Sequence, residues 1–262
     1  MRKLTCLFLG LLIVLSGCNR VADAIVDGAV GGLSRAASER AANAVYKKLA
    51  PKEKLPAPAT PGWNQFMALQ AQIVFTYAFA PGGLWVSRES YQPGEYTKFK
   101  ISEDGEESDA IMEKAFLKKL ENGNEWWRVA WEDEDEVWIY EALLSPSEGR
   151  LLRLRAKDAK GNEGEVPVSE QNVYMQPTEV TDESIEGAKI GEENITTPAG
   201  QFNTDHIRYI ASTNEGSVHW WLTPEVPGGV AKYQMRDENK EVAWTLLLTE
   251  KGDNATTILK SF

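Results

Sequence analysis

A recurring two-residue alternation of side chains constrains the fold of this chain more than any other feature of its sequence. Apolar side chains occupy every second position in the stretches 73–79, 126–131, 152–156, 218–222 and 244–248. Successive side chains of a β-strand point to opposite faces, so this pattern is typical of strands with one buried face. The sequence therefore predicts a mainly β domain.

Short turn motifs separate these stretches. Asn122-Gly123 suits a tight hairpin, because both residues tolerate the positive φ of a type I′ turn. Further turn sequences occupy residues 159–162, 198–200 and 227–229. Residues 108–121 allow a helical turn at their start. The hairpin turn at Asn122-Gly123 instead favours strand pairing of 115–121 with 125–131. These motifs predict one long, strongly curved antiparallel sheet, a half-barrel or open barrel, with few helices.

The N-terminus has the pattern of an export signal. Two basic residues follow Met1, and residues 4–15 are almost wholly apolar but shorter than the ~20 residues of a membrane span. The motif Leu15-Ser16-Gly17-Cys18 comes next. Here the chain resembles bacterial lipoproteins. The resemblance implies removal of residues 1–17 and a palmitate-type acylation of Cys18 that anchors the protein in a membrane.

The resemblance to lipoproteins also implies a location. The residue after the acylated cysteine is Asn19, whereas the family's inner-membrane retention signal has Asp there. We therefore expect an outer-membrane lipoprotein of the cell envelope, on the periplasmic face. Several acyl chains together bind a bilayer firmly, since each buried methylene contributes ~0.8 kcal/mol.

The segment between the anchor and the β domain divides into two parts. Residues 18–50 have apolar positions at helical spacing and small residues at every fourth position from Ala24 to Ala36. This pattern fits either a helix that self-associates or binds a partner, or a weak helix that serves as a flexible stalk. Residues 51–61 contain four prolines and indicate a semi-stiff linker, so the β domain is expected over 62–262.

Composition excludes several classes of function. Besides Cys18 the chain has only Cys6, inside the expected signal, so the mature protein lacks a disulfide and a thiolate metal site. Loss of Arg2 and Lys3 with the signal takes the formal net charge from −11 to −13. Such acidity argues against nucleic acid as a partner.

No motif for catalysis or for a cofactor stands out. The only histidines, His206 and His219, are expected to be ordinary strand residues, because neighbouring strand positions face opposite ways. The acidic run 132–136 lacks the spacing of a calcium loop and indicates a solvated hairpin tip. We therefore expect a protein that is not an enzyme and has no metal or cofactor.

Two C-terminal stretches carry a second resemblance. "TPAGQFNTDHIRY" at 197–209 and "VHWWLTPEVPGGVAKYQM" at 218–235 are similar to a pattern of uncharacterised bacterial envelope proteins. Those proteins resemble in outline the half-barrel of the Lol lipoprotein carriers, a curved sheet whose concave face holds acyl chains. The resemblance covers 188–259 and implies a fold, since no carrier residue can be assigned.

Tryptophans are the strongest indication of a binding surface. The chain has nine, and the candidates for a ligand groove are Trp126, Trp127, Trp131, Trp138, Trp220 and Trp221. Filling of the core explains most of them. Adjacent strand residues face opposite ways, however, so one tryptophan of each of the pairs 126–127 and 220–221 must lie off the main core.

Three functions are compatible with these features. The first is a non-catalytic, lipid-anchored envelope protein whose curved sheet binds a lipid, another hydrophobic ligand or an envelope partner. The second is a structural or assembly lipoprotein that acts through the helix in 19–50. The third is a hydrolase of envelope glycans with carboxylates that the sequence does not reveal.

Overall fold

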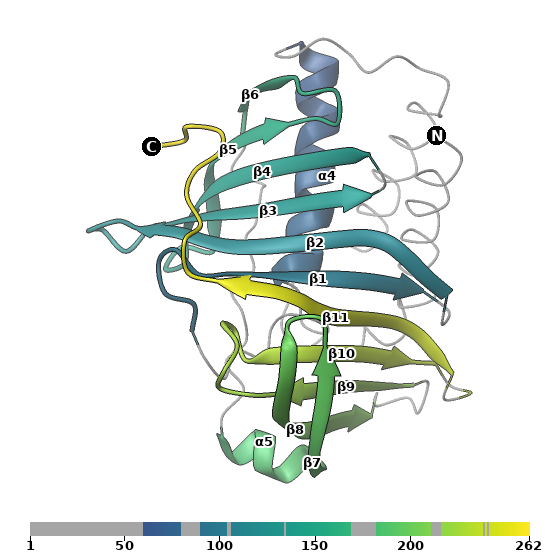
Figure 1. The fold of residues 1–262 in the computed structure, drawn as a ribbon. Helices are drawn as coiled ribbons and strands as arrows, with labels where there is room; N and C mark the ends of the chain where they lie inside the picture. Colours follow the sequence, from purple (N-terminus) through teal and green to yellow (C-terminus); the bar gives the residue numbers. More distant parts are fainter. Residues whose placement is uncertain are drawn as a thin grey trace.

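The protein is built on one open antiparallel sheet (Figure 1). The computed structural model describes residues 60–79, 90–103, 106–133, 135–168, 182–210, 216–237, 239 and 241–262. Within them, eleven strands are hydrogen-bonded in the order β6-β5-β4-β3-β2-β1-β11-β10-β9-β8-β7, with β6 and β7 at the edges. The prediction of a mainly β, curved and open antiparallel sheet is confirmed.

The sheet consists of two halves that meet where β1 pairs with β11. The first half contains β1 (Tyr96–Glu103), β2 (Glu106–Lys119), β3 (Glu125–Asp133), β4 (Glu136–Ser145), β5 (Arg150–Lys157) and β6 (Glu163–Val166). The second half contains β7 (Lys189–Thr197), β8 (Gly200–Ile210), β9 (Ser217–Leu222), β10 (Val230–Arg236) and β11 (Val242–Gly252). The described helices are α4 (Pro61–Phe79) and α5 (Asp182–Ala188).

The predicted strands are confirmed with one exception, and the predicted turns lie between paired strands as expected. The stretches 126–131, 152–156, 218–222 and 244–248 lie in β3, β5, β9 and β11. Asn122-Gly123 lies in the turn between β2 and β3, and Gly123 has a φ of 84°. Asn122 lacks a positive φ, so the turn is not of the predicted type I′, which needs a positive φ at both residues. The other predicted turns, at 159–162, 198–200 and 227–229, each connect two paired strands.

The exception is the stretch 73–79, which was predicted as a strand and is the last part of helix α4. A run in which nearly every residue is apolar satisfies a period of two and a period of 3.6 equally well. The buried residues Trp63, Met67, Ala71, Val74 and Ala78 recur at intervals of three and four, which is the helical period.

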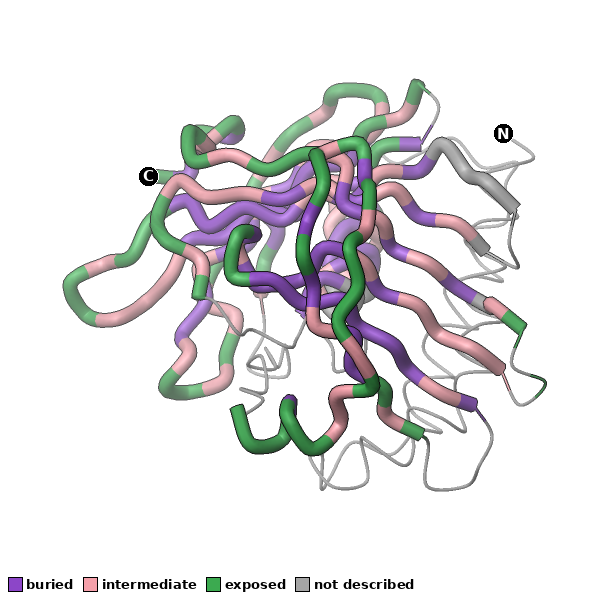
Figure 2. The backbone as a smooth tube through the Cα atoms, turned by 60° about the horizontal axis from the view of Figure 1, so that its bottom comes forward, coloured by how far each residue is buried: buried purple, intermediate pink, exposed green. Residues whose placement is uncertain are grey.

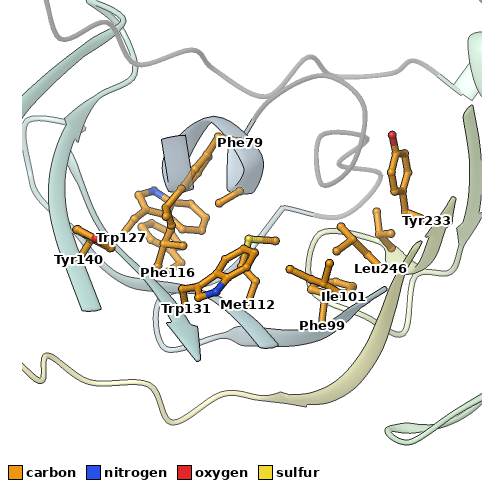
Figure 3. Packing of buried hydrophobic residues seen from close by; sticks show 14 of the residues in the cluster. Phe79, Phe99, Ile101, Met112, Phe116, Trp127, Trp131, Tyr140, Tyr233 and Leu246 are labelled. Carbon is orange, nitrogen blue, oxygen red and sulfur yellow. The ribbon is translucent and has the colours of Figure 1, made fainter. Parts of the chain in front are cut away.

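Helix α4 lies across β1–β6 on one face of the sheet, which we call the inner face (Figure 1). Two buried hydrogen bonds fix its position. The Trp63 indole donates to Asp158 Oδ2 at 3.0 Å, and the Tyr140 hydroxyl donates to Gln70 Oε1 at 2.7 Å. Both bonds satisfy polar groups that would be costly to bury unpaired. The main core fills the space between α4 and the strands (Figure 3).

The opposite face, which we call the outer face, is crossed by the hairpin of β7 and β8. Strand β7 contacts β11, although three strands separate the two in the sheet order. Figure 1 shows α4 behind the sheet and β7 in front of it, and Figure 2 shows that this hairpin exposes much of its length. Strand β7 therefore covers part of the outer face of β9–β11.

Several earlier predictions fall outside the described residues. These are the signal at 1–17, the acylated Cys18 and helical or flexible stalk of 18–50, and most of the linker 51–61. They stay predictions. Among the residues that the structure describes, no helix is long and apolar enough to span a membrane.

Candidate functional site

All six candidate tryptophans are buried, each less than 7% exposed. Trp127, Trp131, Trp138 and Trp220 belong to the main core. Trp126 and Trp221 lie outside this core, as the argument from adjacent pairs required. The tryptophans therefore occupy three environments: the inner face and two places on the outer face.

Among the residues that the structure describes, Lys114 of β2 is a cation buried on the inner face. Its side chain is 3% exposed. Its Nζ lies 4.2 Å from the ring centroid of Phe79, 5.0 Å from that of Tyr91 and 5.2 Å from that of Trp127. The three rings come from the end of α4, from the segment before β1 and from β3. We call Lys114 and these rings the lysine site.

Ring contacts hold the aromatic side chains of the lysine site in place, and Figure 3 shows Phe79, Phe116 and Trp127 close together. Trp127 stacks on Phe116 with centroids 4.6 Å apart and meets the edge of Phe79 at 5.1 Å. The Trp127 indole donates to Glu125 Oε2 at 3.0 Å. The Tyr91 hydroxyl is hydrogen-bonded to Thr97 Oγ1 at 2.6 Å. Each aromatic side chain is thus held by further contacts.

Burial changes the acid–base properties of this site. Desolvation lowers the pKa of Lys114 from 10.5 to about 7, and the nearby Glu125 carboxylate opposes part of that shift. Burial also raises the pKa of the Tyr91 hydroxyl, which stays protonated. The amine is therefore close to half-charged at neutral pH, and an anion beside it would favour the ammonium form.

Trp126 lies on the outer face beneath the C-terminal segment 253–262. Its ring is 5.7 Å from that of Phe262, and the Arg153 guanidinium lies 5.4 Å above it. The segment is held by Glu141, which is fully buried and accepts hydrogen bonds from the Ile258 amide at 2.6 Å and the Ser261 hydroxyl at 2.5 Å. Trp126 therefore supports a docked segment of the same chain.

Trp221 lies in a polar cluster on the outer face, which we call the histidine cluster. His206 Nε2 lies 2.8 Å from His219 Nδ1, and His206 Nδ1 lies 2.6 Å from Glu193 Oε1. The Ser217 hydroxyl lies 3.0 Å from His219 Nε2. The Trp221 ring stacks on His206 at 4.2 Å and its indole donates to Glu193 Oε2 at 2.8 Å.

This cluster was not predicted, because neighbours along the chain do not reveal which strand positions face each histidine. In the sheet, His206 is opposite Trp221, and Arg208 is opposite His219. The two histidines are therefore diagonal neighbours across β8 and β9, within reach of each other's rings. The signal in the sequence was that positions 217, 219 and 221 share one strand face. Among the described residues, no group of three or more residues is suited to a metal ion.

The acidic run 132–136 spans the end of β3 and the start of β4, at the position predicted for a hairpin tip. Asp133 is paired with Glu136 across the tip. Glu132 and Asp135 are exposed, whereas Asp133 is buried. The tip is therefore only partly solvated.

Comparison with protein-family models gives no match, and comparison with curated proteins gives none. Several solved structures are similar to this chain. The Pseudomonas aeruginosa MucA/MucB complex matches 62% of this chain at 12% identity and a TM-score of 0.38, and this chain spans 52% of the matched one. Protein CT021 of Chlamydia trachomatis matches 69% of this chain and 96% of its own, at 9% identity and a TM-score of 0.43.

A third similar structure is a domain from Vibrio parahaemolyticus described as an outer membrane lipoprotein-sorting protein. It matches 65% of this chain and 91% of its own, at 11% identity and a TM-score of 0.27. At such identities and TM-scores, none of these similarities supports an argument about function. The functional assignment therefore rests on the chain's own residues.

Proposed function

We propose that the protein is a lipid-anchored protein of the cell envelope whose inner face binds an amphiphile, with its acyl chain on the apolar strands and its anionic head at Lys114. The observation that supports this role is a lysine amine buried among three aromatic rings on a mostly apolar face. The role assigned to this face is binding, not catalysis.

A core needs no amine, and burying one is unfavourable. Desolvation of an ammonium group costs several kcal/mol unless an opposite charge or hydrogen bonds compensate. The ring faces around Lys114 compensate in part, by roughly 0.5–2 kcal/mol each. A ligand carboxylate or phosphate would supply the remainder, because a charge-assisted hydrogen bond in a dry site is strong.

The end of α4 is the proposed point of entry. The hydrogen bonds from Trp63 and to Gln70 hold the earlier turns of the helix against the sheet. Phe79, at its last position, covers Lys114 through ring contacts with Trp127 and Phe75. Contacts between rings are less directional than hydrogen bonds, so this end is the part of α4 that yields to a ligand.

Fluorescence titration tests the binding role. The chain from 19 to 262 is titrated with 11-(dansylamino)undecanoic acid, followed by displacement with oleate, dioleoyl phosphatidate or oleyl alcohol. We expect both anionic lipids to displace the probe at least tenfold better than the neutral alcohol. Lys114→Met should lower the affinity for the anions by about 10–100-fold, and Lys160→Met, at an exposed turn, should not.

Two outcomes would contradict the binding role. One is equal displacement of the probe by oleate and oleyl alcohol, which would show that the ligand's negative charge does not contribute to binding at Lys114. The other is the absence of any probe binding by the folded protein. That second result would favour a role in assembly through residues 19–50.

The anchor is a separate part of the proposal. We infer acylation of Cys18 and an outer-membrane location with the domain in the periplasm, supported by the motif Leu15-Ser16-Gly17-Cys18 and by Asn19. Cys18→Ser should move the protein from the membrane fraction to the soluble fraction, and Cys6→Ser should not. Intact mass of the detergent-extracted protein should show the loss of residues 1–17 and the added lipid.

A further inference from the structure

The histidine cluster forms a continuous hydrogen-bonded chain of four groups from three strands. Glu193 comes from β7, His206 from β8, and both Ser217 and His219 from β9. The three links measure 2.6, 2.8 and 3.0 Å. Both histidines are buried, and Ser217 at the other end of the chain is partly exposed.

The direction of these hydrogen bonds follows from the acidic end. The Trp221 indole and His206 hold the pKa of Glu193 below its usual range, so the carboxylate is ionised and only accepts. Nδ1 of His206 therefore carries a hydrogen. In the tautomer with both rings neutral, Nε2 of His206 accepts a hydrogen from Nδ1 of His219. Nε2 of His219 then has a free lone pair, which accepts the hydrogen of the Ser217 hydroxyl.

The geometry between the two rings supports a shared proton rather than a shared metal. The facing nitrogens lie 2.8 Å apart and the ring centroids 5.1 Å apart. A ring nitrogen is about 1.1 Å from its centroid, so the two nitrogens point almost directly at each other. Ligands of one metal ion would instead point at a third position.

We propose that Ser217, His219, His206 and Glu193 form a catalytic site on the outer face that hydrolyses an ester carrying a negative charge. A serine, a base that accepts its proton and a carboxylate that orients the base are the elements of nucleophilic acyl transfer. Here His206 stands between the base and the carboxylate. This activity is separate from the lipid binding proposed for the inner face.

Two arginines indicate the charge of the substrate. Arg236 of β10 is directly opposite Ser217, and Arg208 of β8 is directly opposite His219. Both charges act on the His219 ring. A carboxylate, sulfonate or phosphate on the ester would lie between them, and the developing oxyanion would lie close to the Arg236 side chain.

Each step of the proposed reaction conserves protons and bonds. Ser217 Oγ forms a bond to the ester carbonyl carbon while its proton moves to His219 Nε2. The bond from that carbon to the alcohol oxygen then breaks, and the alcohol takes the proton from His219 Nε2. Water repeats the sequence on the acyl-serine, which releases the acid and restores the Ser217 hydroxyl.

The test compares two chromogenic esters with the chain from 19 to 262. We expect faster hydrolysis of 4-acetoxy-3-nitrobenzoate than of uncharged 4-nitrophenyl acetate. Ser217→Ala should reduce the protein-dependent rate at least 100-fold, whereas Ser147→Ala, at the exposed β4–β5 turn, should leave it unchanged. A fluorophosphonate should label the protein once, with the label on Ser217 by peptide mass spectrometry.

Glu193 is a positioning residue, and a pH profile separates its role from a structural one. Burial lowers the pKa of His219, as do the charges of Arg236 and Arg208, whereas the Glu193 charge raises it. Glu193→Gln should therefore reduce the rate about tenfold and move the acid limb of the profile to lower pH. A purely structural effect of the substitution would lower the rate by the same factor at every pH and leave the acid limb of the profile where it is.

Two results would overturn the catalytic proposal. The first is a folded wild-type protein that neither hydrolyses the charged ester above the Ser217→Ala background nor reacts with the fluorophosphonate. The second is labelling of another serine with full activity in Ser217→Ala. Lipid binding at Lys114 is measured independently, so failure of one proposal leaves the other standing.

Discussion

Replacement of Lys114 by methionine should make the protein more stable while weakening its proposed binding of anionic lipids. Methionine has nearly the same length as lysine and suits the apolar, aromatic surroundings of this side chain. It removes an amine that the folded protein keeps at 3% exposure. Sites that serve function at the expense of stability are expected to respond in this way.

The magnitude follows from proton linkage. The unfolded lysine binds its proton up to a pH near 10.5, and the folded one releases it near 7. Between these values the unfolded state binds more protons, so the free energy of unfolding of the wild type rises with pH. At pH 7 the shift corresponds to roughly 4 kcal/mol of lost stability, and above pH 10.5 to almost none.

Urea unfolding at pH 7 and at pH 10.5 measures this effect. We expect Lys114→Met to exceed the wild type by about 2–4 kcal/mol at pH 7, with the difference vanishing near pH 10.5. Lys160→Met, at an exposed turn, should match the wild type at both values. If Lys114→Met is less stable than the wild type by the same amount at both pH values, the amine stabilises the core and our reasoning is wrong.

Three further predictions concern the outer face. Glu141→Ala leaves several donors of the C-terminal segment 253–262 without their acceptor, so the free energy of unfolding should fall by about 3 kcal/mol and proteolysis near residue 258 should be faster. Unchanged proteolysis would contradict the role of Glu141 in holding this segment. Gly216→Ala places a Cβ 2.4 Å from a backbone oxygen of β10, so its melting temperature should fall clearly, unlike that of Gly187→Ala, which meets nothing within 4 Å. Because the pKa of His219 is lowered from 6.5 to about 4, the unfolded state binds more protons between these values. The wild type should therefore lose up to roughly 3 kcal/mol relative to His219→Gln as pH falls from 7 to 4, and parallel pH curves would refute this.

The alternating pattern and the turn residues were sufficient to predict the sheet. Side-chain alternation and hairpin turns are local properties, so Asn122-Gly123 and the stretch 126–131 specify a hairpin without knowledge of the rest of the chain. The same reasoning placed one tryptophan of each adjacent pair away from the main core, as Trp126 and Trp221 are.

Local patterns failed where two periods fitted equally or where partners were distant. The stretch 73–79 is a helix whose apolar side chains pack against the inner face of the sheet. The choice between helix and strand therefore depends on packing against strands far along the chain.

The two proposed sites depend on tertiary structure in the same way. Lys114 meets Phe79 and Trp127 only through the register of β2 with β3 and the position of α4. His206 and His219 meet only through the pairing of β8 with β9. The sequence determined which segments are strands, because that choice is local. The fold decided which polar groups became neighbours, because strand order and register bring together residues that no local pattern relates.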